Sequence, residues 1–331
     1  MRYYNIPIFV PHYGCPFDCV FCNQKHITGE EEIPSGNRTT EIINEYLKTL
    51  PEKDSCIEAA FFGGSFTAVD EALQTELLAA AYEFVKDGRI DGIRLSTRPD
   101  FIDDDVMARL MKYGVTSIEL GVQSMDEAVL LASGRGHTAE TVEKAVETIK
   151  KYPVKLGLQM MTGLPADTDE RSIETAKRII ALNPDFVRIY PTLVIKDTKL
   201  CSMYQSGEYK PQSLDGAVEL AAKLMEMFSE NGITVIRAGL AATDEISPGG
   251  ALVAGPYHSA FGELAEGEIF YNRIRLALGD SKKAEIAVNP RDISKAVGNC
   301  RKNIKRLEES GFDVKFVQDD TVEKGEIKRK D

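Results

Sequence analysis

The chain has 331 residues, of which 43% are hydrophobic, and its formal net charge is −12 at pH 7. This length allows about two domains or one large α/β barrel, and the negative charge argues against a protein covered with nucleic-acid contacts. No apolar run approaches the roughly 20 residues that span a bilayer, and the N-terminus shows no signal pattern, so we expect a cytoplasmic protein without membrane contact.

Short apolar runs alternate with amphipathic helical patterns along the first 240 residues. We predict strands at 6–10, 57–62, 93–97, 117–122, 155–161, 186–191 and 234–240. We predict helices near 39–49, 70–86, 103–113, 138–151, 168–182 and 213–231, with N-caps at Thr39, Asp70, Asp103, Thr138 and Ser213. The strands are continuous apolar runs, which is typical of parallel strands covered by helices. The pattern predicts an α/β fold, namely a partial (β/α)6-type TIM barrel over residues 1–240.

The pattern changes after residue 240. The segment 241–259 is rich in Gly, Pro and Ser and predicts a boundary or an active-site loop. Further helices near 263–278 and 291–310 and strands at 284–288 and 312–317 predict a small α/β extension over 241–320. We expect residues 321–331 to be a disordered tail. From Ser281 to Asp331 there are 13 lysines and arginines against 10 acidic residues, which permits a local RNA contact or, alternatively, only a solvated helix face.

Three cysteines, Cys15, Cys19 and Cys22, follow the first predicted strand with the spacing C-x3-C-x2-C. Loops at the carboxyl ends of barrel strands carry the active site in this architecture. Three closely spaced thiolates can hold three irons of a cubane cluster and leave the fourth iron open to a reacting ligand. The motif alone also allows zinc, with His12 or His26 as the fourth ligand, in a zinc-stabilised binding or scaffold protein on a degenerate barrel.

Further candidate binding residues lie at the ends of later predicted strands. Gly63 and Gly64, in FFGGSFT, let the backbone approach a ligand, and Ser65 and Thr67 offer hydroxyls; a plain strand-to-helix turn is the other interpretation. Arg135, in GRGHT, is suited to clamp a carboxylate because its guanidinium is bidentate and always charged. For Glu119, an ion pair at the rim of the core and a ligand contact are both open. The segment 195–211 would cross the barrel mouth as a lid or form a solvated loop.

The cysteine segment resembles the radical S-adenosylmethionine superfamily, whose C-x3-C-φ-C motif, with φ aromatic, stands here with Phe21 before Cys22. The resemblance implies a [4Fe-4S] cluster on Cys15, Cys19 and Cys22. It further implies that S-adenosylmethionine binds the open iron and that an external electron donor drives its cleavage to methionine and a 5′-deoxyadenosyl radical. Contacts to S-adenosylmethionine are implied for Gly63, Gly64, Ser65, Thr67, Ser96, Gln123, Arg135, Gln159, Met161 and Leu164.

Two narrower resemblances refine these expectations. The spacing of Gln123 and Arg135 and the segment LQMMTGLP (158–165) are similar to oxygen-independent coproporphyrinogen oxidases, with Gln159 and Ser96 replacing acidic residues there. STRPD, ELGVQS, RGHT, RIYPTLVIKDTKL and GPYHSAFGEL together resemble the radical domain of the catalytic subunit of Elongator over roughly residues 1–280. That resemblance implies tRNA as a partner, and the mildly basic C-terminal extension permits a local contact with it. We expect the acetyltransferase domain of that subunit to be missing, so the substrate stays open between tRNA and a small molecule.

Overall fold

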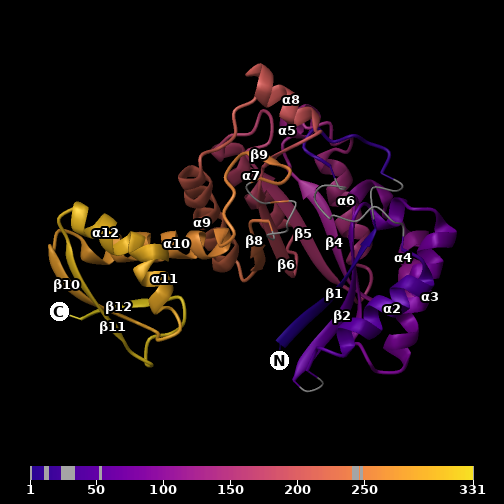
Figure 1. Cartoon of the computed structure of the whole chain (residues 1–331), viewed down its shortest axis with the longest axis horizontal. Coiled ribbons are helices and arrows are strands. Elements are labelled where there is room, and N and C mark those ends of the chain that lie inside the picture. Colours follow the sequence, from indigo (N-terminus) through magenta and orange to yellow (C-terminus); the bar gives the residue numbers. More distant parts are fainter. Residues whose placement is uncertain are drawn as a thin grey trace.

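A seven-stranded, wholly parallel sheet forms the body of this computed structural model, which describes residues 2–10, 15–23, 34–51, 54–240, 246 and 249–330 (Figure 1). The strand order is β1-β2-β3-β4-β5-β6-β8. The strands are β1 (Arg2–Val10), β2 (Ser55–Gly63), β3 (Gly92–Thr97), β4 (Val115–Gln123), β5 (Lys155–Thr162), β6 (Phe186–Pro191) and β8 (Thr234–Ala238). Each strand pairs with its sequence neighbour except that β6 pairs directly with β8. The predicted partial barrel is confirmed.

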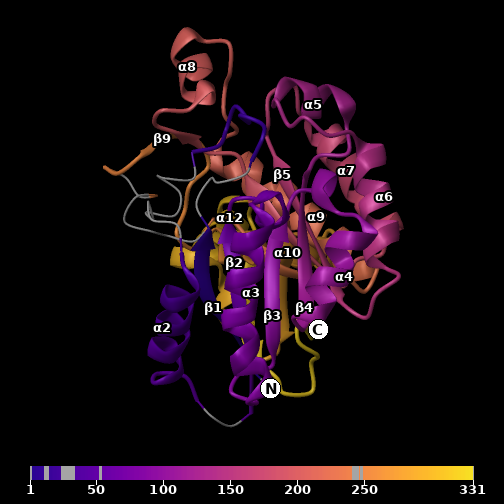
Figure 2. The same cartoon turned by 90° about the vertical axis from the view of Figure 1, so that its right-hand side faces the viewer.

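Helices cover the outer face of this sheet (Figure 2). They are α2 (Gly36–Leu47), α3 (Glu71–Lys86), α4 (Asp104–Lys112), α6 (Ala139–Ile149), α7 (Asp169–Ala181) and α9 (Leu214–Glu230), while the short α5 (Glu127–Ala132) lies at the carboxyl end of the sheet. Asp70, Asp103, Thr138 and Ser213 each accept a backbone N–H as predicted. The prediction for Thr39 is wrong. Helix α2 begins earlier, its N-cap is Ser35, and Thr39 lies buried inside it.

The hydrophobic core lies between the sheet and these helices. Ile6, Phe61, Leu95 and Leu120 from the strands are fully buried against apolar side chains such as Leu77 from α3. Burial of side chains on both faces of the strands explains why the strands read as continuous apolar runs.

A short antiparallel ribbon of β7 (Val194–Ile195) and β9 (Leu252–Ala254) lies at the carboxyl end of the sheet together with α8 (Lys199–Ser206) (Figure 2). Tyr209, which follows α8, donates its hydroxyl to the carbonyl oxygen of Gly163 at 2.6 Å. The expected lid segment 195–211 is therefore mostly structured and is tied to the end of β5.

The long helix α10 (Phe261–Leu278) leads from the barrel into the C-terminal extension (Figure 1). Phe261 and Ala265 pack on α9 at one end, while Ile274 and Leu278 pack in the core of the extension. The extension contains β10 (Lys283–Val288), α11 (Ile293–Val297), α12 (Lys302–Glu309), β11 (Asp313–Gln318) and β12 (Ile327–Lys330), with the strand order β11-β10-β12.

Two expectations about the extension differ from the structure. The single helix predicted at 291–310 is broken into α11 and α12, because Gly298, Cys300 and Arg301 adopt positive φ between them. Residues 321–331 were expected to be disordered, but Ile327–Lys330 form β12 and pair antiparallel with β10. The polar composition of this segment hid a strand whose Ile327 packs against the core of the extension. Over the described ranges, no helix is both long and apolar enough to cross a membrane.

Candidate functional site

A cavity of about 570 Å³ opens at the carboxyl ends of the barrel strands. Cys15, Cys19 and Cys22 all line it. Eight of the residues expected to contact S-adenosylmethionine line it as well: Gly63, Gly64, Ser65, Ser96, Gln123, Arg135, Gln159 and Met161. The structure thus brings together in one cavity residues that are up to 146 positions apart in the sequence.

Two of the expected contact residues lie elsewhere. The side chain of Thr67 is buried and its hydroxyl bonds to the hydroxyl of Thr97 at 2.5 Å, so it supports the turn and does not line the cavity. Leu164 lines a separate cavity of about 500 Å³, together with Tyr209 and Lys210. Of the segment 158–165, Gln159 and Met161 on β5 line the cavity with the cysteines. The chain turns away at Gly163, which has a φ of 72°, and this turn places Leu164 in the other cavity.

The cysteine segment is fixed to the body of the barrel on two sides. The backbone N–H of Val20 donates to the carbonyl of Ser133 at 3.0 Å, and the N–H of Leu200 donates to the carbonyl of Val20 at 2.7 Å. The side chain of Val20 is buried against Val194 and Leu200. Within the segment, the N–H of Cys22 donates to the carbonyl of Cys19 at 3.0 Å, which forms a tight turn between the second and third thiols.

The thiols differ in their exposure. Cys19 is buried, while Cys15 and Cys22 are half-buried. In the described ranges, no group of three or more His, Cys, Asp and Glu side chains is arranged to hold a single metal ion. His12 and His26, which the zinc interpretation requires, lie outside the described residues, so that interpretation stays a prediction.

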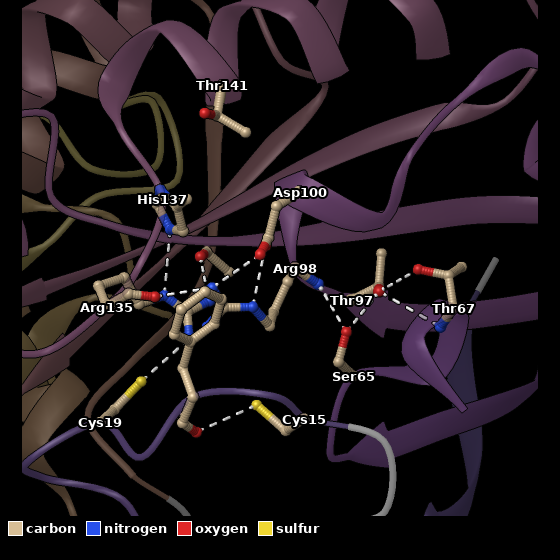
Figure 3. A network of polar contacts seen from close by, with 12 residues as sticks. Cys15, Cys19, Ser65, Thr67, Thr97, Arg98, Asp100, Arg135, His137 and Thr141 are labelled. Atoms are coloured by element: carbon tan, nitrogen blue, oxygen red, sulfur yellow. Dashed lines mark hydrogen bonds and ion pairs between the residues drawn. The ribbon is translucent and has the colours of Figure 1, made fainter. Parts of the chain in front are cut away.

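Arg135 lies beside Cys19 (Figure 3). Its Nη1 donates to Cys19 Sγ at 3.6 Å and its Nη2 donates to the carbonyl of Gly121 at 2.5 Å. Its Nε donates to Nε2 of His137 at 3.1 Å. Because Nε2 accepts this bond, the imidazole proton lies on Nδ1, which donates to the carbonyl of Thr138 at 3.3 Å.

The imidazole of His137 is held neutral by its surroundings. Burial lowers the pKa of His137 from 6.5 to about 4, and the charges of Arg135 and Arg98 add to this effect, while Asp100 opposes it. As the pH falls below 6.5, His137 is protonated in the unfolded chain, whereas in the folded chain it stays neutral down to about pH 4. Because the unfolded chain then binds more protons, the free energy of unfolding decreases.

We therefore predict that folding becomes acid-sensitive through His137. Between pH 7 and pH 5 the wild type should lose about 2 kcal/mol more unfolding free energy than the variant His137→Gln, whose amide keeps an acceptor without titrating. Urea unfolding at the two pH values measures the difference. Equal pH dependence of the two proteins would contradict the assignment.

The glycine turn after β2 is held by the strands on both sides of it. Gly63 has a φ of 106°, a backbone conformation that favours glycine, and the N–H of Gly64 donates to the carbonyl of Val10 at 2.7 Å. The hydroxyl of Ser65 bonds to that of Thr97 at 2.9 Å (Figure 3). This turn therefore presents backbone groups to the cavity with little freedom.

Gln123, the last residue of β4, carries an unsatisfied polar atom. Its φ is 67°, and the pairing register of β4 with β5 shifts between Gly121 and Gln123. Its Oε1 is buried and has no hydrogen-bond partner. A strained backbone and an orphaned acceptor on a cavity wall are typical of a residue that is completed by a ligand.

A buried network of charged side chains lies among the barrel strands, and its member Arg188 also lines the cavity. Arg188 donates to both carboxylate oxygens of Glu119, at 2.6 and 3.0 Å, and Arg94 bridges Glu119 to Glu58. Burial alone would raise the pKa of Glu119. The charge of Arg188 and the hydrogen bonds that the Glu119 carboxylate accepts outweigh this effect, so the pKa of Glu119 is lowered. Of the two interpretations of Glu119, the structure shows the ion pair.

Sequence reasoning missed Glu58, Arg94 and Arg188 as parts of this network. The available signal was a charged residue in the middle of an otherwise apolar strand, as in IEAAFF, IRLST and FVRIYP. Gln159 was expected to contact S-adenosylmethionine. Its amide donates to Glu119 at 2.9 Å and to Ser96 at 3.3 Å, which fixes its orientation at the cavity wall.

Comparison with known proteins gives two family matches. A model described as Radical SAM superfamily matches residues 9–179, and one described as Radical_SAM C-terminal domain matches residues 184–270. Elongator complex protein 3 from Homo sapiens is 33% identical over 203 residues, which cover 55% of this chain and 37% of that protein. A tRNA uridine(34) acetyltransferase from Methanocaldococcus jannaschii is 30% identical over 196 residues, which cover 53% of this chain and 36% of that protein.

Solved structures share the fold. The archaeal Methanocaldococcus infernus Elp3 with an N-terminal deletion gives a TM-score of 0.62 at 23% identity, covering 82% of this chain and 68% of that one. Coproporphyrinogen III oxidase from Escherichia coli gives a TM-score of 0.50 at 16% identity, covering 70% of this chain and 52% of that one. The matched part of this chain spans little more than a third of the length of the two curated relatives.

Proposed function

This chain belongs to the radical S-adenosylmethionine superfamily of enzymes, and we propose that it cleaves S-adenosylmethionine reductively with a [4Fe-4S] cluster held by Cys15, Cys19 and Cys22. The observation that carries the proposal is the single cavity lined by all three thiols and by eight of the ten residues that were expected to bind the nucleotide.

The residues of the cavity fit both groups chemically. Three cysteine thiolates on one short segment are the donor set of a cubane cluster that keeps one iron open. The buried, unpartnered Oε1 of Gln123 offers an acceptor to a ligand donor such as an ammonium or a ribose hydroxyl. When bound, the cluster supplies the electron that breaks a carbon–sulfur bond of the sulfonium and yields methionine and a 5′-deoxyadenosyl radical.

The side chains and backbone around the cavity hold S-adenosylmethionine and exclude water. The Gly63–Gly64 turn offers backbone groups to the methionine end, and Gln123 and Ser96 offer polar contacts along the neighbouring strands. Phe9, Phe62 and Leu193 form apolar walls of the same cavity. Such walls keep water from a reactive carbon radical, which would otherwise be quenched in side reactions.

A uridine in tRNA is the substrate class that the relatives suggest, since one of them is named a tRNA uridine(34) acetyltransferase. The charges of the extension favour at most a small RNA contact. Lys302 pairs with Asp215 at 2.6 Å, Lys295 pairs with Glu266 at 3.2 Å, and Arg306 pairs with Glu268. Cations that are already paired contribute less to counterion release on RNA binding.

The proposal is tested by anaerobic reconstitution with iron and sulfide, addition of S-adenosylmethionine and dithionite, and detection of 5′-deoxyadenosine. Adding tRNA to the same assay at low and high salt tests the substrate class. We expect faster nucleoside release with tRNA at low salt and loss of this effect at high salt. A colourless protein that binds one zinc per chain and no iron after reconstitution would instead support the zinc-stabilised scaffold.

A further inference from the structure

All three nitrogens of the Arg135 guanidinium donate hydrogen bonds to groups of the protein, among them a thiol of the cysteine segment (Figure 3). Cys19 Sγ, the carbonyl of Gly121 and Nε2 of His137 each accept one of its N–H groups. A carboxylate clamp would require two parallel N–H groups of the guanidinium to face the ligand. Here Nε, Nη1 and Nη2 each already donate one hydrogen bond within the protein, and the bond from Nη1 orients Arg135 toward Cys19.

The position of Arg135 is fixed by packing as well as by hydrogen bonds. A Cβ added to Gly121 would lie 2.7 Å from Nη2 of Arg135, so only glycine leaves room for the guanidinium there. Nη2 of Arg98 donates to the carbonyl of Arg135 at 2.7 Å, and the guanidinium of Arg98 lies over the ring of Phe17 in the cysteine segment. Arg135 itself is only 7% exposed.

The charge of Arg135 is not neutralised by a carboxylate within the described ranges. Asp100, the nearby acid, is bound by Nε and Nη2 of Arg98 at 2.9 and 3.0 Å. His137 accepts from Arg135 as a neutral imidazole. A full positive charge therefore lies in hydrogen-bond contact with one of the three thiols.

We propose that Arg135 is a positioning residue whose hydrogen bond to the Cys19 sulfur raises the reduction potential of the cluster. The inference rests on the proposed function, because it requires the cluster on Cys19. Reduction adds one negative charge to a cluster with thiolate ligands, and a cation that donates to a ligand sulfur stabilises the reduced state more than the oxidised state. Hydrogen bonds to ligands are an established means of tuning a metal centre.

The test is a reductive titration of the reconstituted cluster without S-adenosylmethionine. The EPR signal of the reduced state is recorded during the titration and gives the midpoint potential. We expect Arg135→Gln to retain iron and sulfide at the wild-type level and to shift the midpoint potential to a more negative value. Arg135→Lys should shift it in the same direction by less, because an ammonium keeps the charge but cannot serve the three acceptors at once.

Two further variants separate this role from a structural one. His137→Gln keeps an acceptor for Nε, so its midpoint potential should stay close to that of the wild type. Arg171→Gln removes the same charge from a half-buried residue of α7, which pairs with Asp126 and does not line the cavity, and should leave the potential unchanged. If Arg135→Gln takes up no cluster, the midpoint potential of Arg135→Lys is the deciding measurement, and it should again be more negative than that of the wild type.

An unchanged midpoint potential in a fully loaded Arg135 variant would overturn the inference. If that variant also binds S-adenosylmethionine more weakly in equilibrium dialysis, Arg135 would be assigned to the carboxylate clamp expected from the sequence. A wild-type chain that takes up no cluster would contradict the proposed function itself, which distinguishes the two failures.

Discussion

Replacement of Cys19 by serine is expected to reduce cluster-dependent cleavage of S-adenosylmethionine by a factor on the order of 100 or more, since even groups that only support metal ligands typically cost 10- to 100-fold. Cys19 is the most buried of the three thiols, and both its neighbour Val20 and its contact Arg135 fix its place. A serine oxygen is a harder and weaker ligand for iron than a thiolate.

The measurement is iron and acid-labile sulfide per chain after anaerobic reconstitution, together with 5′-deoxyadenosine released. Cys56→Ser is the control because Cys56 lies near the start of β2 and does not line the cavity; its thiol is half-buried, whereas that of Cys19 is buried. Full cluster content and wild-type release in Cys19→Ser would show that Cys19 is not a cluster ligand.

Replacement of Glu119 by glutamine is expected to destabilise the barrel by about 3–5 kcal/mol, the usual cost of leaving a buried charge without its partner. The carboxylate of Glu119 is fully buried and receives hydrogen bonds from Arg94, Arg188 and Gln159. Glutamine has nearly the same shape but offers one oxygen in place of two and no charge. Arg94 then keeps Glu58 as its partner, whereas Arg188 loses the carboxylate with which it pairs.

Urea unfolding of the reconstituted protein, followed by far-UV circular dichroism, measures this change. Glu174→Gln is the control, because Glu174 forms an exposed pair with Lys177 at 3.2 Å and such pairs contribute little. If the unfolding free energy of Glu119→Gln falls by no more than about 0.5 kcal/mol, as at ordinary surface positions, the network would not stabilise the barrel.

The sequence predicted the barrel well because its strands are buried on both faces. Apolar runs such as IPIFV and SIELGV can be recognised without knowledge of their partners, and the alternation with helices then determines a parallel sheet. The cysteine spacing located the cavity for the same local reason: Cys15, Cys19 and Cys22 are close in sequence and follow β1 directly.

Features that depend on distant partners were not predictable in the same way. The ion network needs Glu58 from β2 and Arg188 from β6, and only the register of the folded sheet brings their side chains to Glu119 and Arg94. The strand β12 was hidden because its charged residues Lys328 and Lys330 are tolerated at an edge of the small sheet, where β10 supplies the pairing.

Residues in the same local segment also separate at a turn. Met161 lines the cavity with the cysteines, whereas Leu164, three residues later, lines another cavity beyond Gly163. Thr67 and Ser65 are a second case: the hydroxyls of both bond to that of Thr97 (Figure 3), but Ser65 lines the cavity and Thr67 does not. Motif spacing identified the segments, but the backbone turns decide which side chains face the ligand.

The most direct test of the account is the amount of 5′-deoxyadenosine formed per chain when dithionite is added to anaerobically reconstituted protein with S-adenosylmethionine. We predict a brown protein with about four irons per chain that releases this nucleoside, and at most about a hundredth of that release from Cys19→Ser under identical conditions. The proposed reaction would be contradicted by a wild-type protein whose complete cluster is reduced by dithionite but which releases no 5′-deoxyadenosine, with or without tRNA.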